Sequence, residues 1–429
     1  MKKNYSGVLF IFLLPIISLV LLFNSKGLNL APKNVNEFML LLGKIFGILG
    51  MSTFAISIIL SARLPILDKI FNGLNVVYLR HSQIGQISFI LMLFHPILLL
   101  SNYTDMTFEG ALHFIFISSD WNLNFGILAL FLMILLIVLT LYFQIKYNVW
   151  KWTHKFMGLA FFLASLHVFL IPSDISRYLP LRIYMLVLSG VAIGFYLYRS
   201  ILHKYAVEKY TYEVSEVKKV GSSITEIILK PTDKKLLFTA GQFIFISFLD
   251  KNIGLESHPF SITAGNDKED LSITIKDLGD YTKNIDKVLV GTKALVEGPF
   301  GRFSYKDSIY KKQIWIAGGI GITPFLSMAR SIESKDGYEI DLYYCVKNES
   351  ESIYLTELSN YQNKGIQVIP FYSEKEGFIN VEKIKEISGS LPDKSIFICS
   401  PVSMIQALRA QFIRNGISKS VIHSEEFSL

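Results

Sequence analysis

The first half of this chain is almost continuously apolar, whereas the second half mixes apolar and polar positions. Six apolar runs with short polar separators occupy about residues 7–23, 38–60, 76–100, 125–145, 151–171 and 180–200. At about 1.5 Å per residue, each run is long enough to cross most of a hydrocarbon layer about 30 Å thick. The pattern therefore predicts a six-helix transmembrane bundle within residues 1–205.

After about residue 205 the apolar positions recur with a period of two, which is typical of strands with one buried face. Residues 212–217, 224–229 and 271–276 alternate in this way, with glycine or proline in the intervening turns. These runs predict an antiparallel β-barrel over residues 206–308.

From residue 309 onwards, strand patterns and helix patterns alternate. Strands are expected at 314–317, 342–346, 367–371, 396–399 and 421–423, and helices after 323, near 354–363 and at 401–414. This order is typical of a Rossmann-like α/β domain that binds a nucleotide, here predicted over residues 309–429.

Four of the eight histidines lie inside apolar runs, in two pairs: His81 with His95, and His154 with His167. A lone buried histidine is more often a satisfied packing residue than a ligand. Buried imidazoles in lipid nevertheless need partners, and each pair spans roughly 20 Å of helix. Two helices with histidines at matched depths predict two haems, each iron held by one histidine from each helix.

The spacing of the second pair does not fit a regular helix. His81 and His95 are 14 residues apart and share a face, but His154 and His167 are 13 apart. At about 100° per residue, that spacing falls roughly 140° short of the same face. We expect either a local distortion of this helix, with Gly158 as the weak point, or a lateral offset between the two haems.

The net charge of +7 is explained by membrane topology and does not require nucleic acid as a partner. With the N-terminus inside, the inner segments hold Lys2, Lys3, Arg63, Lys69, Arg80, Lys146, Lys151, Lys155, Arg199, Lys204 and Lys209. The outer segments hold Lys26, Lys33, Arg177 and Arg182, and loop 101–124 carries only acidic charges. This asymmetry predicts a multi-pass cell-membrane protein whose N-terminus and C-terminal half are cytoplasmic.

The first apolar run, two further histidines and the two cysteines do not change this prediction. The first apolar run resembles a signal peptide, but the residues after it form a poor cleavage site, which favours an uncleaved span. His113 and His203 are expected outside the haem ligand set. Cys345 and Cys399 both lie in the second half and form no disulfide framework.

Two motifs in the expected barrel are candidates for flavin contacts. The first is His258-Pro259-Phe260-Ser261 with Thr263, and the second comprises Lys276, Gly279, Tyr281 and Thr282. Gly279 could open a helix whose free N–H groups face an anion. Each motif alone is weak, because a Pro-Phe pair at a barrel corner and a glycine in a turn are usually structural.

The motifs that follow are more specific for a dinucleotide. One is Gly298-Pro299-Phe300-Gly301, and the other comprises Gly318, Gly319, Gly321, Thr323 and Pro324 between a strand and a helix. Small residues there allow the backbone to approach a pyrophosphate at a helix N-terminus. Cys399, Ser400 and Pro401 end another strand at the same edge, where Cys399 is either a core residue or a positioning residue beside the nicotinamide.

Lys347 follows the strand at 342–346, where a basic side chain could contact a 2′-phosphate. A single lysine is a weak signal, and the choice between NADPH and NADH stays open at this point.

Taken together, these residues resemble the NADPH oxidase family over the whole chain. The resemblance covers the four histidines, His258–Ser261, Gly279–Thr282, Gly318–Pro324 and Cys399–Pro401. It implies a ferric-reductase-like domain with two haem b groups, followed by a ferredoxin-reductase-like module for FAD and NAD(P)H. It also implies a C-terminal aromatic residue that stacks on the isoalloxazine, here Phe427. No EF-hand loop or Pro-rich tail is present, which is typical of a minimal, prokaryotic-type member without an obligatory regulatory subunit.

The resemblance implies that electrons pass from NAD(P)H through FAD and the haems to external oxygen, forming superoxide. A transmembrane ferric or cupric reductase shares every motif, and the acidic loop 101–124 would attract metal cations. A third reading is an electron-delivery subunit for an extracytoplasmic enzyme. These alternatives differ in the terminal acceptor, which the motifs do not specify.

Overall fold

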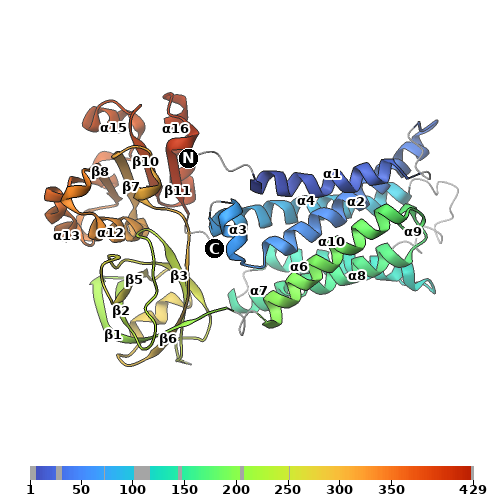
Figure 1. Ribbon diagram of the computed structural model, residues 1–429, viewed down its shortest axis with the longest axis horizontal. Helices are drawn as coiled ribbons and strands as arrows, with labels where there is room; N and C mark the ends of the chain where they lie inside the picture. The colour runs from blue at the N-terminus through green and yellow to red at the C-terminus, as the bar shows by residue number, and fades with distance from the viewer. Residues whose placement is uncertain are drawn as a thin grey trace. The chain divides into compact units, whose positions relative to one another are not determined.

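The chain folds into two compact units, residues 4–206 and, in the main, residues 207–429. The computed structural model describes residues 6–25, 31–71, 73–100, 116–143, 147–202, 207–250 and 252–426 (Figure 1). His113, His203 and Phe427, which were named from the sequence, lie outside these ranges.

The first unit is helical throughout its described part. Its helices are α1 (Ser6–Phe23), α2 (Val35–Leu60), α3 (Pro65–Phe71), α4 (Leu74–Leu100), α6 (Trp121–Tyr142), α7 (Tyr147–His154), α8 (Met157–Leu170), α9 (Asp174–Arg177) and α10 (Leu179–Leu197), followed by a π-helical turn (Tyr198–Leu202). Among the described residues, five apolar helical stretches are long enough to cross a membrane: Val35–Leu60, Leu74–Leu100, Trp121–Thr140, Val149–Leu170 and Leu179–Leu202. The expected first span coincides with α1, which is apolar over Gly7–Phe23 but shorter than the other five.

The core of this unit lies between the long helices, while many apolar side chains face outward. Met51, Phe161 and Met185 are at most 1% exposed, and the Phe54 ring meets Phe161 edge-on at 5.1 Å. On the outer surface Phe131 is 67% exposed. An outward apolar surface on a helical bundle is what a lipid solvent requires.

The helix that carries the second histidine pair is broken. Helix α7 ends at His154 and α8 begins at Met157. At the break, the N–H groups of Lys155 and Phe156 bond carbonyls three residues back, at 3.2 and 2.9 Å. Such tighter turns advance the chain by more rotation per residue than an α-helix. The expected distortion is therefore present, just before Gly158.

Gly158 has a packing role in addition. A Cβ atom at this position would lie 2.2 Å from the Tyr196 ring of α10, so the close contact between α8 and α10 requires glycine.

The second unit begins with an antiparallel barrel-like sheet, as the alternating pattern predicted. Its strands are β1 (Tyr210–Gly221), β2 (Ile224–Pro231), β3 (Phe243–Phe248), β4 (His258–Ser261), β5 (Leu271–Lys276) and β6 (Lys293–Phe300), in the order β4-β3-β6-β1-β2-β5. A bridge between Ile262 and Ile273 joins the two edges and closes the sheet on itself. Val214, Ile227, Ile246 and Ile273 fill its interior without solvent exposure.

The rest of the unit is a parallel five-stranded sheet covered by helices on both faces. Its strands are β7 (Lys312–Gly318), β8 (Glu339–Val346), β9 (Ile366–Tyr372), β10 (Ser395–Cys399) and β11 (Ile422–Glu425), in the order β11-β10-β7-β8-β9. Helices α12 (Ile322–Ser331) and α13 (Leu355–Ser359) pack on one face, and α15 (Val381–Ser388) and α16 (Val402–Arg414) on the other, with a short α14 (Ser373–Glu376) after β9. Helices α14 and α15 were not expected from the sequence.

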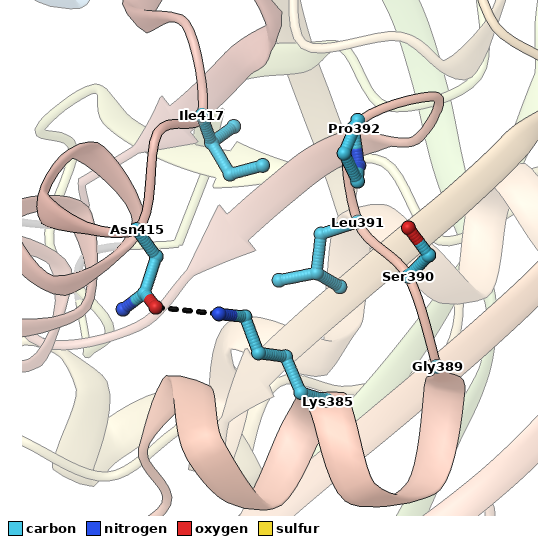
Figure 2. A pocket seen from close by; sticks show the side chains of 7 residues that line it. All are labelled: Lys385, Gly389, Ser390, Leu391, Pro392, Asn415 and Ile417. Carbon is cyan, nitrogen blue, oxygen red and sulfur yellow. Dashed lines mark hydrogen bonds between the residues drawn. The ribbon is translucent and has the colours of Figure 1, made fainter.

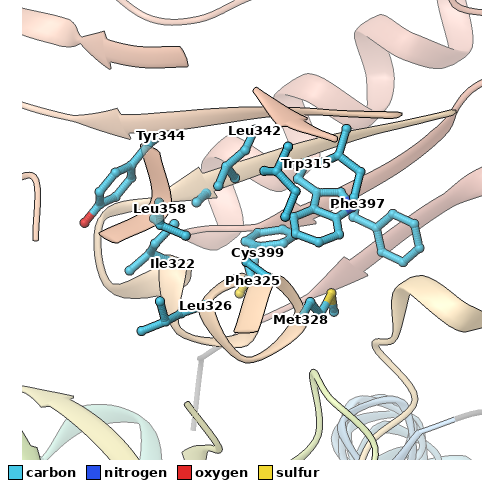
Figure 3. Packing of buried hydrophobic residues seen from close by; sticks show 14 of the residues in the cluster. Trp315, Ile322, Phe325, Leu326, Met328, Leu342, Tyr344, Leu358, Phe397 and Cys399 are labelled. Carbon is cyan, nitrogen blue, oxygen red and sulfur yellow. The ribbon is translucent and has the colours of Figure 1, made fainter. Parts of the chain in front are cut away.

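Barrel and α/β sheet are joined by a polar and an apolar contact. The apolar cluster of α12 continues into Phe303 and Ala240 of the barrel, and Figure 3 shows the part around Trp315 and Phe325. Arg330 of α12 donates two hydrogen bonds to Glu357, at 2.7 and 2.9 Å, and a third to a barrel carbonyl. Glu226 of β2 lies 3.5 Å from the same guanidinium. These contacts hold the two halves of the unit together.

Candidate functional site

Three of the four membrane histidines are held in the same way, by a backbone carbonyl of a neighbouring helix. The Nδ1 atom lies 2.7 Å from the Ser57 carbonyl oxygen in His81, 2.7 Å from that of Gly43 in His95, and 2.8 Å from that of Asn122 in His167. A carbonyl only accepts, so Nδ1 carries the proton and donates. Nε2 is then the free lone pair, which is the tautomer that a metal ligand requires.

Glycines on the same helices make room for the outer pair. A Cβ atom at Gly47 would lie 2.7 Å from the His95 ring, and one at Gly126 would lie 2.8 Å from the His167 ring. Each glycine stands four residues after the carbonyl that accepts from the same histidine. Helix α2 and helix α6 therefore each provide a seat made of one carbonyl and one glycine, which the sequence analysis missed. His95 and His167 also lie close enough to interact electrostatically.

The inner pair has the separation that one iron requires. The ring centroids of His81 and His154 are 6.1 Å apart and the ring planes cross at 84°. Metal–imidazole bonds of about 2 Å on opposite sides of one ion place the ring centres about 6 Å apart. The two residues therefore fit a bis-imidazole site for haem iron.

His154 differs from the other three histidines. Its Nδ1 atom is buried without a hydrogen-bond partner among the described residues. Instead, the Trp150 ring of α7 stacks on the imidazole at 5.3 Å, with 25° between the planes. The orientation of His154 thus depends on an aromatic contact from its own helix.

In the second unit, the two expected flavin motifs are adjacent. His258 of β4 stacks on Tyr281, with ring centroids 3.8 Å apart. Lys276 ends β5, and the Thr282 hydroxyl accepts hydrogen bonds from the N–H groups of Leu278 and Gly279, at 2.9 Å each. The expected helix after Gly279 is only a short 3-10 helix (Thr282–Lys287).

Several buried polar atoms at this site have no partner among the described residues: Ser261 Oγ, the Tyr281 hydroxyl and Glu425 Oε2. Burial and, to a lesser degree, Glu256 raise the pKa of Tyr281 above its usual value, so its hydroxyl stays a donor. Thr263 is not among these, because its hydroxyl bonds Ser272 at 2.9 Å. Pro259 and Phe260 pair with β3 as strand residues. Unpartnered buried polar atoms fit a polar ligand such as a flavin.

Phe243 and Gly301 connect the flavin motif on β4 with Glu425 of the α/β domain. Phe243 pairs with Ser261 in the sheet, and a Cβ atom at Gly301 would lie 3.0 Å from the Phe243 ring and 3.5 Å from Glu425 Oε1. Gly298 and Gly301 both have positive φ, 146° and 92°. Glu425 in turn pairs with Cys399 across the parallel sheet. The barrel motif therefore leads directly to the strand ends of the α/β domain.

The glycine loop after β7 packs on the end of β10. A Cβ atom would lie 2.6 Å from Ser400 Cβ at Gly318 and 2.1 Å from the Cys399 carbonyl oxygen at Gly321. Gly319 has a φ of 55°, and the Thr323 hydroxyl bonds the Ile320 carbonyl. Pro324 is buried in the first turn of α12, and Pro401 precedes α16. The two dinucleotide motifs thus form one backbone surface.

Cys399 is fully buried, in the cluster of Trp315 and Phe325 (Figure 3). Burial, and then the neighbouring Glu425, raises the pKa of its thiol well above the usual range. This placement favours a core role, and contact with a nicotinamide stays a prediction. Burial also raises the pKa of Glu425 to about 8, so this carboxyl is largely protonated at neutral pH. Sequence reasoning missed Glu425, although its position at a strand end beside Phe427 was a signal.

Lys347 lies at the carboxyl end of β8 and is exposed, as expected. Its carbonyl accepts a hydrogen bond from the N–H of Glu374, which follows β9.

A surface hollow of about 370 Å³ lies elsewhere in this domain (Figure 2). It is lined by Lys385, Gly389, Ser390, Leu391, Pro392, Asn415 and Ile417, which precede β10 and β11. It therefore lies at the amino ends of the strands, whereas ligands of such sheets bind at the carboxyl ends.

Comparison with known families matches three consecutive parts of the chain. Residues 46–165 match the ferric reductase like transmembrane component, residues 209–321 an FAD-binding domain, and residues 315–410 the oxidoreductase NAD-binding domain. These matches agree with the three parts expected from the sequence pattern.

Among curated proteins, the chain is 25% identical over 224 residues to the carnitine monooxygenase reductase subunit of Escherichia coli, which covers 51% of this chain and 68% of that protein. It is 29% identical over 145 residues to mouse NADPH oxidase 1, covering 33% of this chain and 24% of that protein. It is 37% identical over 127 residues to Arabidopsis thaliana ferric reduction oxidase 8, covering 26% and 17%. The chain thus spans a quarter or less of the last two relatives.

Among solved structures, the flavohaemoglobin of Malassezia yamatoensis, described with bound FAD and haem, aligns over 100% of this chain and 99% of its own, with a TM-score of 0.53 and 16% identity. That likeness concerns the fold alone. The sequence matches carry the assignment: the chain is a transmembrane flavoprotein oxidoreductase that joins a ferric-reductase-like component to FAD-binding and NAD-binding domains, and its resemblance to the NADPH oxidase family is confirmed.

Proposed function

We propose that this protein is a transmembrane NAD(P)H oxidase that reduces external oxygen to superoxide through FAD and two bis-histidine haems. The observation that carries the proposal is the His81–His154 pair, whose ring centroids are 6.1 Å apart inside an apolar bundle. The carbonyl–glycine seats of His95 and His167 support a second site of the same kind.

The cofactors would supply the redox chemistry: FAD takes up a hydride and releases electrons singly, and haem iron carries one electron at a time. The chain's residues bind and orient. The glycine surface at Gly318–Gly321 receives a pyrophosphate, and Ser261 and Tyr281 offer unpartnered hydroxyls to the flavin. One NAD(P)H would supply two electrons, which reduce two oxygen molecules to two superoxide ions and release one proton.

The histidine ligands also restrict how oxygen could be reduced at the outer side of the membrane. His81 with His154, and His95 with His167, would each hold one haem iron through two imidazoles, and a haem held in this way would supply single electrons and would not bind oxygen directly. One-electron reduction to superoxide follows from that arrangement. The uneven distribution of Lys and Arg between alternate inter-helix segments supports an orientation with the N-terminus and the dehydrogenase domains in the cytoplasm, and with His95 and His167 toward the outside.

A second candidate function is transmembrane reduction of ferric or cupric ions. It is favoured by the match of residues 46–165 to the ferric reductase like component and by the similarity to ferric reduction oxidase 8. Both functions use the same inner residues, and they differ only in the acceptor.

Assays of electron acceptors with purified protein that holds FAD and haem distinguish the oxidase from the metal reductase. We expect NAD(P)H-driven cytochrome c reduction that superoxide dismutase abolishes. Fe(III) reduction that continues without oxygen, with no dismutase-sensitive signal, would instead establish the metal reductase. Replacing His81 or His154 with Ala should remove haem absorbance while NAD(P)H still reduces the flavin, and His113→Ala serves as the control. A parent protein without a Soret band would refute both functions.

A further inference from the structure

The carboxyl ends of β8 and β9 carry more acidic than basic side chains. Residues 347–351 and 373–376 contain the lysines Lys347 and Lys375 and the glutamates Glu349, Glu351, Glu374 and Glu376. Lys347 was the residue expected to meet a 2′-phosphate. The tertiary structure places the Glu374 carboxylate on Asn348, the residue that follows Lys347.

Glu374 is held at this edge by two connections to the end of β8. The Asn348 amide donates to both of its carboxylate oxygens, at 3.2 Å each. Its N–H bonds the Lys347 carbonyl oxygen at 3.1 Å. The carboxylate therefore has a defined place beside the residue that follows the second strand of the domain.

Lys375, the basic residue next to Glu374, contacts the Tyr372 ring. The Lys375 ammonium lies 5.6 Å from the centre of the Tyr372 ring, over its face. Lys347 follows β8 directly, and the Glu374 N–H bonds its carbonyl oxygen.

The position of a bound dinucleotide follows from the sheet order. The glycine surface lies at the end of β7, and the flavin motifs reach the sheet on the β10–β11 side, through Gly301 and Glu425. The nicotinamide must therefore extend toward β10 and β11. The adenosine half extends the other way, over the ends of β8 and β9, which lie about 5 and 10 Å from β7. The match of residues 315–410 to a NAD-binding domain independently indicates the ligand.

A carboxylate that lies beside the end of the second strand, as Glu374 does through Asn348, discriminates between the two nucleotides. It accepts a hydrogen bond from the free 2′-hydroxyl of an NAD ribose, whereas a 2′-phosphate needs a cation such as Arg. A phosphate beside Glu374 would meet a like charge, and Glu349, Glu351 and Glu376 add to the repulsion.

We propose that NADH, not NADPH, is the hydride donor of this protein, and that Glu374 sets this preference by accepting a hydrogen bond from the ribose 2′-hydroxyl. The inference names the substrate of the proposed function, but it rests only on the dinucleotide site and is independent of the terminal acceptor.

The test is anaerobic reduction of the flavin in the purified full-length holoprotein, followed at the flavin absorbance with NADH or NADPH. We expect a kcat/KM ratio that favours NADH by about tenfold or more, since one like-charge contact at a surface costs about that factor. Glu374→Arg should reverse or abolish the ratio, mainly by raising kcat/KM for NADPH, and Glu374→Gln should lower it. Glu386→Arg makes the same charge change on α15, next to Lys385 of the hollow at the amino ends of the strands, and should leave the ratio unchanged.

Equal or faster flavin reduction by NADPH in the parent protein would overturn the proposal. So would a Glu374→Arg variant that binds flavin normally and keeps the parent's ratio. A protein that prefers NADH but forms no superoxide would refute the proposed function and leave this inference standing.

Discussion

Gly47→Ala tests whether the second haem depends on the seat that α2 provides. The new Cβ would lie 2.7 Å from both Cε1 and Nδ1 of His95, whereas ordinary contacts begin at 3.4 Å. A retreat of the ring by about 0.7 Å would lengthen the 2.7 Å bond from Nδ1 to the Gly43 carbonyl beyond the ordinary N–H···O range of about 2.7–3.2 Å. Overpacking of this kind costs about 1–3 kcal/mol, and the lost hydrogen bond adds about 1 kcal/mol.

The assay is haem content per flavin together with an anaerobic redox titration. Losing the hydrogen-bond partner of a metal-bound histidine lowers metal affinity about 10- to 100-fold. We therefore expect Gly47→Ala to lose or strongly shift one of two haems and to keep the one at His81 and His154. Gly126→Ala should have the same effect through His167, and the double variant should be little worse than either.

Gly190→Ala and Gly194→Ala are the matched controls. Both glycines lie in α10, and an added Cβ meets nothing within 4 Å at either position. They should keep two haems and unchanged potentials. If Gly47→Ala behaved like these controls, with full haem content and the parent's titration curve, the proposed seat for His95 would be wrong.

Three further predictions concern Trp150 beside His154, the buried carboxyl of Glu425, and the Arg330 ion pairs between the barrel and the α/β sheet. Trp150→Leu removes the ring stacked on His154 and should shift the low-spin electron paramagnetic resonance signal of one haem, whereas the control Trp152→Leu, at a 61% exposed position in the same helix, should not. Because burial raises the pKa of Glu425 to about 8, folding keeps a proton that the unfolded chain loses above about pH 4.5. The parent should therefore lose stability between pH 5 and 8, and Glu425→Gln should not; parallel melting curves would contradict this. Arg330→Met leaves its carboxylate partners uncompensated and should destabilise the dehydrogenase unit by about 3 kcal/mol in urea unfolding, and an unchanged midpoint would show that the ion pairs are dispensable.

The apolar runs, the alternation after residue 205 and the strand–helix order were sufficient to predict the three parts of the chain. These are local patterns, because a period of 3.6 or 2 is decided by neighbouring residues along the sequence. The glycine loop after β7 could be identified for the same reason. Helix α15 was missed because it has only eight residues, so its apolar stripe of Val381, Ile384 and Ile387 spans only about two turns.

The sequence by itself determined which histidines lie within apolar helices, but not how they are held. The break between α7 and α8, which lies between His154 and His167, appears only in the folded chain, as does the contact of His154 with His81. The seats of His95 and His167 come from helices distant along the chain, and Glu374 meets Asn348 only because β8 and β9 are neighbours in the sheet. Contacts between separate elements depend on how those elements pack, which no local periodicity encodes, and so only the tertiary structure decided them.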